Sequence, residues 1–201
     1  MLTFDQETHA YRHRDVACGS VTQIIGEFVK SGNFYVNVFT GTSIPAEVFE
    51  SAGQWGTSIH TMVNFYIDND LDFASITEGM RETLSQYQKW EQVFKPEVLS
   101  HEKMLYSTKY GYAGTYDIKA LINGKLWIID IKTGAFGMAG PQLGAYSQLD
   151  KEDDKSRAMR HRAVLRLPKD GDYRFIPMAE HADWPFFLSR LTTYNYVRRQ
   201  K

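Results

Sequence analysis

The chain has 201 residues, of which 43% are hydrophobic and 14% aromatic, which is enough for one sizeable core and predicts a single domain over residues 1–201. The formal net charge of −1 does not mark it as a nucleic-acid binder, and the one cysteine, Cys18, excludes an internal disulfide, a four-cysteine zinc site and a cysteine-ligated iron–sulfur cluster. No apolar run approaches the roughly 20 residues of a membrane span, and the N-terminus has neither a signal-peptide nor a transit-peptide pattern, so we expect a cytoplasmic protein with no membrane partner.

Helical patterns dominate the first half of the chain. The stretch GSVTQIIGEFVK, residues 19–30, predicts that a short helix opens there, with Ser20 as its N-cap and Gln23 in the capping-box position. Apolar residues at helical spacing predict a longer helix around residues 45–68, and a further helix is expected at about 77–95.

The apolar pattern then changes to an alternation with a period of two. It predicts three strands in a meander, at residues 101–107, 112–122 and 125–132. Gly140-Pro141 predicts a helix with proline at its first position, and RAVLRL and DYRFIP predict two strands around a turn at Lys169-Asp170-Gly171. An amphipathic helix closes the last twenty residues. We therefore predict an α/β fold with a mixed central sheet flanked by helices, in which the helix after residue 140 crosses over to a parallel strand.

The hairpin over residues 116–134 contains an unusual arrangement of charge. Its Asn123-Gly124 turn pairs residues whose numbers sum to 247, so Asp117 is expected opposite Asp130, and Lys132 shares their face. Facing carboxylates repel, and one lysine compensates only half of the charge. A divalent cation between them removes the repulsion, and hard oxygen ligands suit magnesium or manganese. The alternative is a solvated Asp–Lys ion pair with Asp117 as a bystander.

A third acid is a possible addition to this group. If residues 108–111 form the preceding turn, Glu102 lies opposite Asp117 on the same face. Glu102 is equally well explained as a surface acid at the start of a strand.

Five short segments, two of which form one signature, resemble a known family. GTYD (114–117) followed across the hairpin by DIKTG (130–134) resembles the signature of the PD-(D/E)XK nuclease superfamily, whose core is restriction-endonuclease-like. GTSIH (56–60) resembles the G-x-x-x-H motif of its RecB-like exonuclease branch, QLGAY (142–146) resembles the Q-x-x-x-Y motif, and SVTQII (20–25) resembles the usual opening. The overall likeness is to small stand-alone members such as phage nucleases and mitochondrial genome maintenance exonucleases.

The resemblance implies roles for the carboxylates and their neighbours. Asp117 and Asp130 would be catalytic residues and ligands of a Mg²⁺ or Mn²⁺ ion. The backbone carbonyl of Ile131 and the His60 side chain would be further ligands. Lys132 would orient or deprotonate the attacking water and stabilise charge on the scissile phosphate.

The second motif implies a group that holds DNA. Gln142 and Tyr146 are four residues apart and so share one face of their helix, and with Thr133 they would contact DNA and support the active site. An ordinary helix with a half-buried tyrosine is the alternative.

The expected function is a metal-dependent DNA exonuclease acting at single-stranded ends, in repair, recombination or replication. The alternatives are a structure-selective endonuclease that cuts flaps or junctions and a non-catalytic DNA-binding recombination module. The sequence has no P-loop, so we expect no nucleotide cofactor, and a helicase, recombinase or single-strand-binding protein would be a separate partner. Residues 45–98 carry nine acids and three bases, whereas residues 155–174 carry seven bases and two acids, so the second segment is either a basic face for a polyanion or a solvated face.

Overall fold

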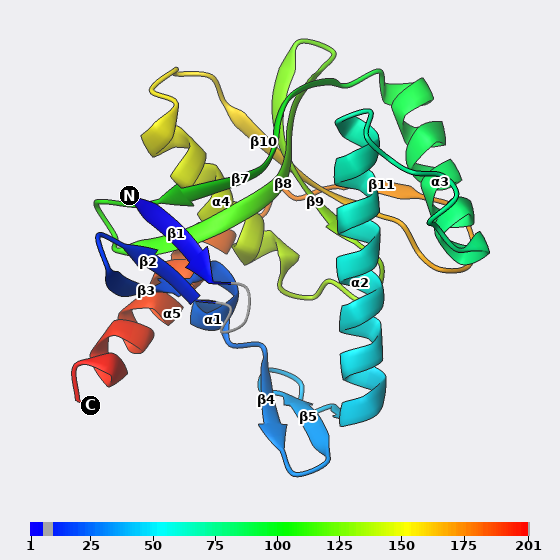
Figure 1. Ribbon diagram of the computed structural model, residues 1–201. Coiled ribbons are helices and arrows are strands. Elements are labelled where there is room, and N and C mark those ends of the chain that lie inside the picture. The colour runs from blue at the N-terminus through cyan, green and yellow to red at the C-terminus, as the bar shows by residue number, and fades with distance from the viewer. Residues whose placement is uncertain (6–9, 201) are drawn as a thin grey trace.

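A mixed sheet of eight strands is present in the part of the chain that the computed structural model describes, residues 1–5 and 10–200 (Figure 1). Its strands are β1 (Leu2–Asp5), β2 (Ala10–His13), β3 (Val16–Ser20), β7 (Glu97–Tyr106), β8 (Tyr112–Ile122), β9 (Lys125–Lys132), β10 (Arg160–Arg166) and β11 (Arg174–Pro177). The order is β1-β2-β3-β8-β9-β10-β11, and β7 pairs with β8. The predicted meander is β7, β8 and β9.

The predicted crossover is confirmed. Helix α4 (Ala139–Asp153) leaves the end of β9 and returns the chain to β10, which pairs with β9 in parallel. The neighbours β7–β8, β8–β9 and β10–β11 are antiparallel, so the sheet is mixed as expected.

Helices cover both faces of the sheet (Figure 1). On one face α1 (Val21–Ile25), α4 and α5 (Asp183–Arg198) form an apolar core with sheet residues that include Ile128 and Val164. On the other face α2 (Ala46–Ile67) and α3 (Glu78–Phe94) pack on sheet residues that include Ile129 and Leu165. Because Ile128 and Ile129 belong to opposite cores, β9 alternates between two buried faces, which explains its almost continuous apolar sequence.

Two local predictions are confirmed at the level of single hydrogen bonds and dihedral angles. Ser20 Oγ accepts a hydrogen bond from the backbone N–H of Gln23, and the Gln23 side chain accepts one from the backbone N–H of Ser20, which is the capping box. In the hairpin turn Asn123 and Gly124 have φ values of 50° and 71°, as a type I′ turn requires, and Ala120 pairs with Trp127.

Three features differ from or add to the expectations. Pro141 is the third residue of α4 rather than the first, a position that is still within the first turn, where a missing backbone N–H has no partner to lose. The N-terminal strands β1 to β3 were not expected. A small sheet of β4 (Phe28–Ser31), β5 (Phe34–Asn37) and β6 (Ser43–Pro45) projects beside the N-terminal end of α2 (Figure 1).

None of the helices in the described ranges combines the length and the apolar character that a membrane crossing requires.

Candidate active site

The strands β8 and β9 separate at the predicted carboxylates. Their ladder ends at the pair Ile118–Ile129, one step short of the expected pair Asp117–Asp130. The Asp117 carboxylate instead accepts a hydrogen bond of 2.6 Å from the backbone N–H of Ile131. The side chain of Asp117 thus satisfies the Ile131 amide beyond the end of the ladder.

The faces of β8 also change at Asp117. Tyr116 packs in the core under α4, whereas Ile118 packs in the core under α2 and α3. Residues two apart on a regular strand share a face, so the strand is irregular between them. The partner strand is irregular at the same point, because Glu102 has a φ of 44°. A left-handed backbone at a residue other than glycine costs roughly 1–2 kcal/mol and is found disproportionately at functional sites.

Glu102 stands opposite Asp117, as the predicted turn requires. The pairs Lys103–Tyr116 and His101–Ile118 lie on either side of them. Burial raises the pKa of the Glu102 carboxyl, and the charge of Asp117 raises it further. Glu102 is thus an exposed side chain whose carboxyl still interacts electrostatically with Asp117.

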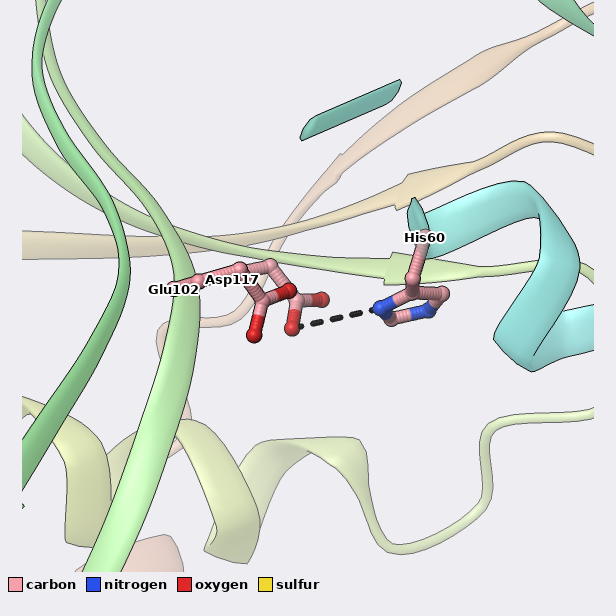
Figure 2. Close-up of side chains that lie close together, drawn as sticks. All are labelled: His60, Glu102 and Asp117. Carbon is pink, nitrogen blue, oxygen red and sulfur yellow. Dashed lines mark ion pairs between the residues drawn. The ribbon is translucent and has the colours of Figure 1, made fainter. Parts of the chain in front are cut away.

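His60 reaches this group from α2. Its Nδ1 lies 3.4 Å from Asp117 Oδ1 and its Nε2 lies 3.0 Å from the carbonyl oxygen of Ile131 (Figure 2). Burial lowers the pKa of His60, but the charges of Asp117 and Asp130 outweigh it and raise the pKa to about 9. A protonated ring donates from both nitrogens, which matches the two oxygen neighbours.

These residues fit a divalent cation. His60, Glu102 and Asp117 each offer a ligand atom, and these atoms lie within 4.8 Å of one another (Figure 2). Two carboxylates and one imidazole form a mainly oxygen donor set that suits manganese or magnesium, and the carbonyl of Ile131 contacts the other ring nitrogen of His60.

Asp130 and Lys132 form a buried ion pair beside this cluster. Asp130 Oδ2 lies 2.8 Å from Lys132 Nζ, and Asp130 is 2% exposed. Burial raises the pKa of Asp130, Lys132 lowers it and Asp117 raises it again, with the result that it lies at about 6. Asp130, expected as the second carboxylate ligand, is thus outside the three-residue cluster and is held by Lys132.

Gln142 and Tyr146 form one unit on α4. The side-chain amide of Gln142 donates a hydrogen bond of 2.9 Å to the Tyr146 hydroxyl. Burial raises the pKa of Tyr146, and the charges of Asp130 and Asp117 add to the effect, which places the phenol near both carboxylates. Tyr146 packs against Gly114, where the absence of a side chain leaves room for the ring, because a Cβ there would lie 2.7 Å from it.

Thr133 and one further acid complete the surroundings. A Cβ on Gly56 would lie 3.6 Å from Thr133 Oγ1, so the glycine of GTSIH faces the residue that follows β9. Glu27, which the sequence analysis did not single out, follows α1 and accepts a hydrogen bond of 3.0 Å from Asn37. Burial raises the pKa of Glu27, and the hydrogen bond from Asn37 and the charge of Lys132 lower it. In the sequence, only the position of Glu27 just after SVTQII could have indicated that it belongs to the site.

No protein-family model and no curated protein matches the sequence. Among solved structures, a candidate exonuclease from Eubacterium rectale is similar over 90% of this chain and 79% of that chain, with 12% identity and a TM-score of 0.56. The chain has an exonuclease-like fold. An alkaline exonuclease from Laribacter hongkongensis aligns over 90% of this chain and 91% of its own at 12% identity, but its TM-score of 0.32 is too low to support an argument. The first likeness agrees with the resemblance to PD-(D/E)XK nucleases, and at this identity it concerns the fold alone.

Proposed function

We propose that residues 1–201 form one nuclease domain that hydrolyses DNA phosphodiester bonds with Mg²⁺ or Mn²⁺, as an exonuclease at single-stranded ends. One observation carries the proposal. His60, Glu102, Asp117 and the Ile131 carbonyl converge where β8 and β9 separate, with the Asp130–Lys132 pair beside them. A metal ligand set next to a lysine can supply an activated water and charge stabilisation for phosphodiester hydrolysis.

The cluster residues and Asp130 have separate roles in this proposal. Asp117, Glu102, His60 and the Ile131 carbonyl would hold the metal ion, and Asp130 would complete the ligand set by turning from Lys132. A bound Mg²⁺ or Mn²⁺ lowers the pKa of its water and offsets charge on the phosphate.

Lys132 would orient or deprotonate the attacking water and stabilise charge on the phosphate. In the metal-free protein burial lowers its pKa, but Asp130 and Asp117 raise it by more, so the amine holds its proton until metal binds. A protonated Lys132 donates to a non-bridging phosphate oxygen and stabilises the charge that develops there. Tyr146 is buried in the core and fixed by Gln142 and by the absence of a side chain at Gly114, so it would support the active site from within the fold.

Digestion of labelled DNA tests the proposal. The substrates are linear single-stranded and duplex oligonucleotides labelled at either end, and a closed circular single strand. Wild type is compared with Lys132→Ala and with Lys125→Ala, a control at the exposed start of the same strand, in magnesium, manganese and chelator.

We expect metal-dependent loss of linear single strands by wild type and Lys125→Ala, with circles intact and Lys132→Ala at least 100-fold slower. Cleavage of circles would replace the exonuclease by an endonuclease. No cleavage of any substrate in either metal would refute the catalytic proposal and leave a DNA-binding module.

A further inference from the structure

Arg166 lies beside Lys132 in the sheet. The parallel register of β9 and β10 pairs the two residues, and the backbone N–H of Leu167 donates to the carbonyl of Lys132 at 2.8 Å. Paired residues of neighbouring strands project to the same face from backbones about 4.8 Å apart. Two residues earlier in each strand, Val164 pairs with Asp130 and packs in the core under α4. Arg166 and Lys132 therefore lie on the face of the sheet that carries Asp130.

The other arginines of β10 are held by acids. Arg160 is buried and its Nε donates to Asp150 at 2.8 Å. Arg162 forms an ion pair of 2.9 Å with Asp183 and donates to the carbonyl of Glu180. The basic run over residues 155–174 is therefore not a single solvated face, because part of it balances internal carboxylates.

Arg166 differs from both of these residues. Within residues 1–5 and 10–200 no acid forms an ion pair with it, and its Nε is buried without an acceptor. A buried donor that lacks a partner destabilises the fold, because it has lost its hydrogen bonds to water. The guanidinium thus carries both a charge and a donor that a ligand can satisfy.

A pocket of about 520 Å³ opens in front of Arg166. The loop after Lys132 forms one side of it through Gly134, Phe136 and Gly137, and the first turn of α4 forms another. Two acids lie at this pocket, but neither forms an ion pair with Arg166: Asp183 is paired with Arg162, and Glu27, which lies against Gly137, accepts a hydrogen bond from Asn37. The pocket therefore favours an anion.

We propose that this pocket binds a phosphate group of the nucleic acid next to the phosphate that is hydrolysed, with Arg166 as its specific contact. The inference rests on the proposed function, because it assigns the neighbouring site to the scissile phosphate. A guanidinium matches two phosphate oxygens with two parallel hydrogen bonds, which lysine cannot do. The ligand is either an internal phosphodiester or a terminal phosphate monoester.

Oligonucleotide binding tests the proposal independently of cleavage. Wild type, Arg166→Gln, Arg166→Lys and the exposed control Arg174→Gln are titrated with fluorescent single strands in calcium, over a series of salt concentrations. The strands carry a phosphate or a hydroxyl at the 5′ or the 3′ end, and gels confirm that they stay intact. Thermal unfolding with and without manganese shows whether each variant is folded and still binds metal.

We expect Arg166→Gln to weaken binding about ten-fold and to lower the salt slope by about 0.7, the value for one phosphate contact on a single strand. Arg166→Lys should keep most of the slope but lose affinity, and Arg174→Gln should match wild type. An equal loss on all strands identifies an internal phosphodiester, whereas a loss confined to one phosphorylated end identifies a terminal monoester.

Unchanged affinity and slope in folded Arg166→Gln, or no oligonucleotide binding by wild type, would overturn the inference. Arg166-dependent binding by a wild type that cleaves nothing would support the phosphate site and refute only the proposed catalysis.

Discussion

Asp130 is a buried carboxylate whose charge is poorly stabilised when no metal is bound. Its pKa rises from an ordinary 3.8 to about 6, which means that the folded state holds the proton more tightly than the unfolded state. The stabilisation that the protonated carboxyl gives the fold is fully present below about pH 4 and is lost as the pH rises through 6. At pH 8 the metal-free protein carries this charge at a cost of roughly 3 kcal/mol, from about 1.4 kcal/mol for each pH unit. Asp130→Asn removes the charge while keeping the shape of the side chain.

Removing the buried charge stabilises the metal-free protein, but part of this stabilisation is lost because Lys132 loses its ion-pair partner at 2.8 Å. We therefore expect Asp130→Asn to stabilise the metal-free protein by about 1–2 kcal/mol at pH 8, which raises Tm by roughly 2–8 °C for a chain of this size. The gain should vanish near pH 4, where the wild-type carboxyl is already protonated. Manganese should raise the Tm of the variant less than that of wild type, because the cluster of His60, Glu102 and Asp117 remains while the completing ligand is gone, and cleavage should be lost.

Thermal unfolding in chelator from pH 4 to pH 8, with and without manganese, measures all of these effects. Asp170→Asn, at an exposed position in the turn before β11, is the matched control and should behave as wild type. A variant that is less stable than wild type at pH 8 in chelator would refute the reasoning, because it would show that the Asp130 charge stabilises the metal-free fold.

Three further predictions concern the neighbours of Asp130. Gly114→Ala places a Cβ 2.7 Å from the Tyr146 ring, so it should destabilise the protein by about 1–3 kcal/mol in urea unfolding, and unchanged stability would contradict the packing. Glu102→Gln should weaken manganese binding about ten-fold in calorimetry, since it removes a charged ligand of the cluster, and unchanged affinity would contradict its place there. The pKa of His60 in the metal-free protein is about 9, so a metal ion must displace a proton from the ring, and the affinity for manganese should rise with pH up to about 9. Calorimetry in buffers of different ionisation enthalpy should detect the release of close to one proton. If no proton is released, His60 is not a metal ligand.

The parts of the site that local sequence determines were predictable. Asn123-Gly124 specifies a two-residue turn, which fixes the register from Ile122–Lys125 to Ile118–Ile129. Helical spacing likewise placed Gln142 within hydrogen-bonding distance of Tyr146. In both cases the contact lies within one hairpin or one helix turn.

The remaining features depend on contacts between distant segments. The ladder ends before Asp117 because its carboxylate bonds to the Ile131 amide, a competition that a strand pattern does not reveal. The left-handed backbone at Glu102 has no glycine to indicate it. Arg166 meets Lys132 only through the parallel pairing that α4 creates, so it lies outside every motif. The N-terminal strands are short and carry polar residues, which weakens their alternating pattern.

The proposed function depends on the cluster of His60, Glu102 and Asp117 being the metal centre of a nuclease. The most direct test is the anomalous scattering of crystals of wild type and Glu102→Gln grown with manganese. We predict a peak in wild type in contact with His60, Asp117 and the Ile131 carbonyl oxygen, weakened or absent in the variant. Metal-dependent cleavage in solution by a protein whose only manganese peak lies elsewhere would contradict the account.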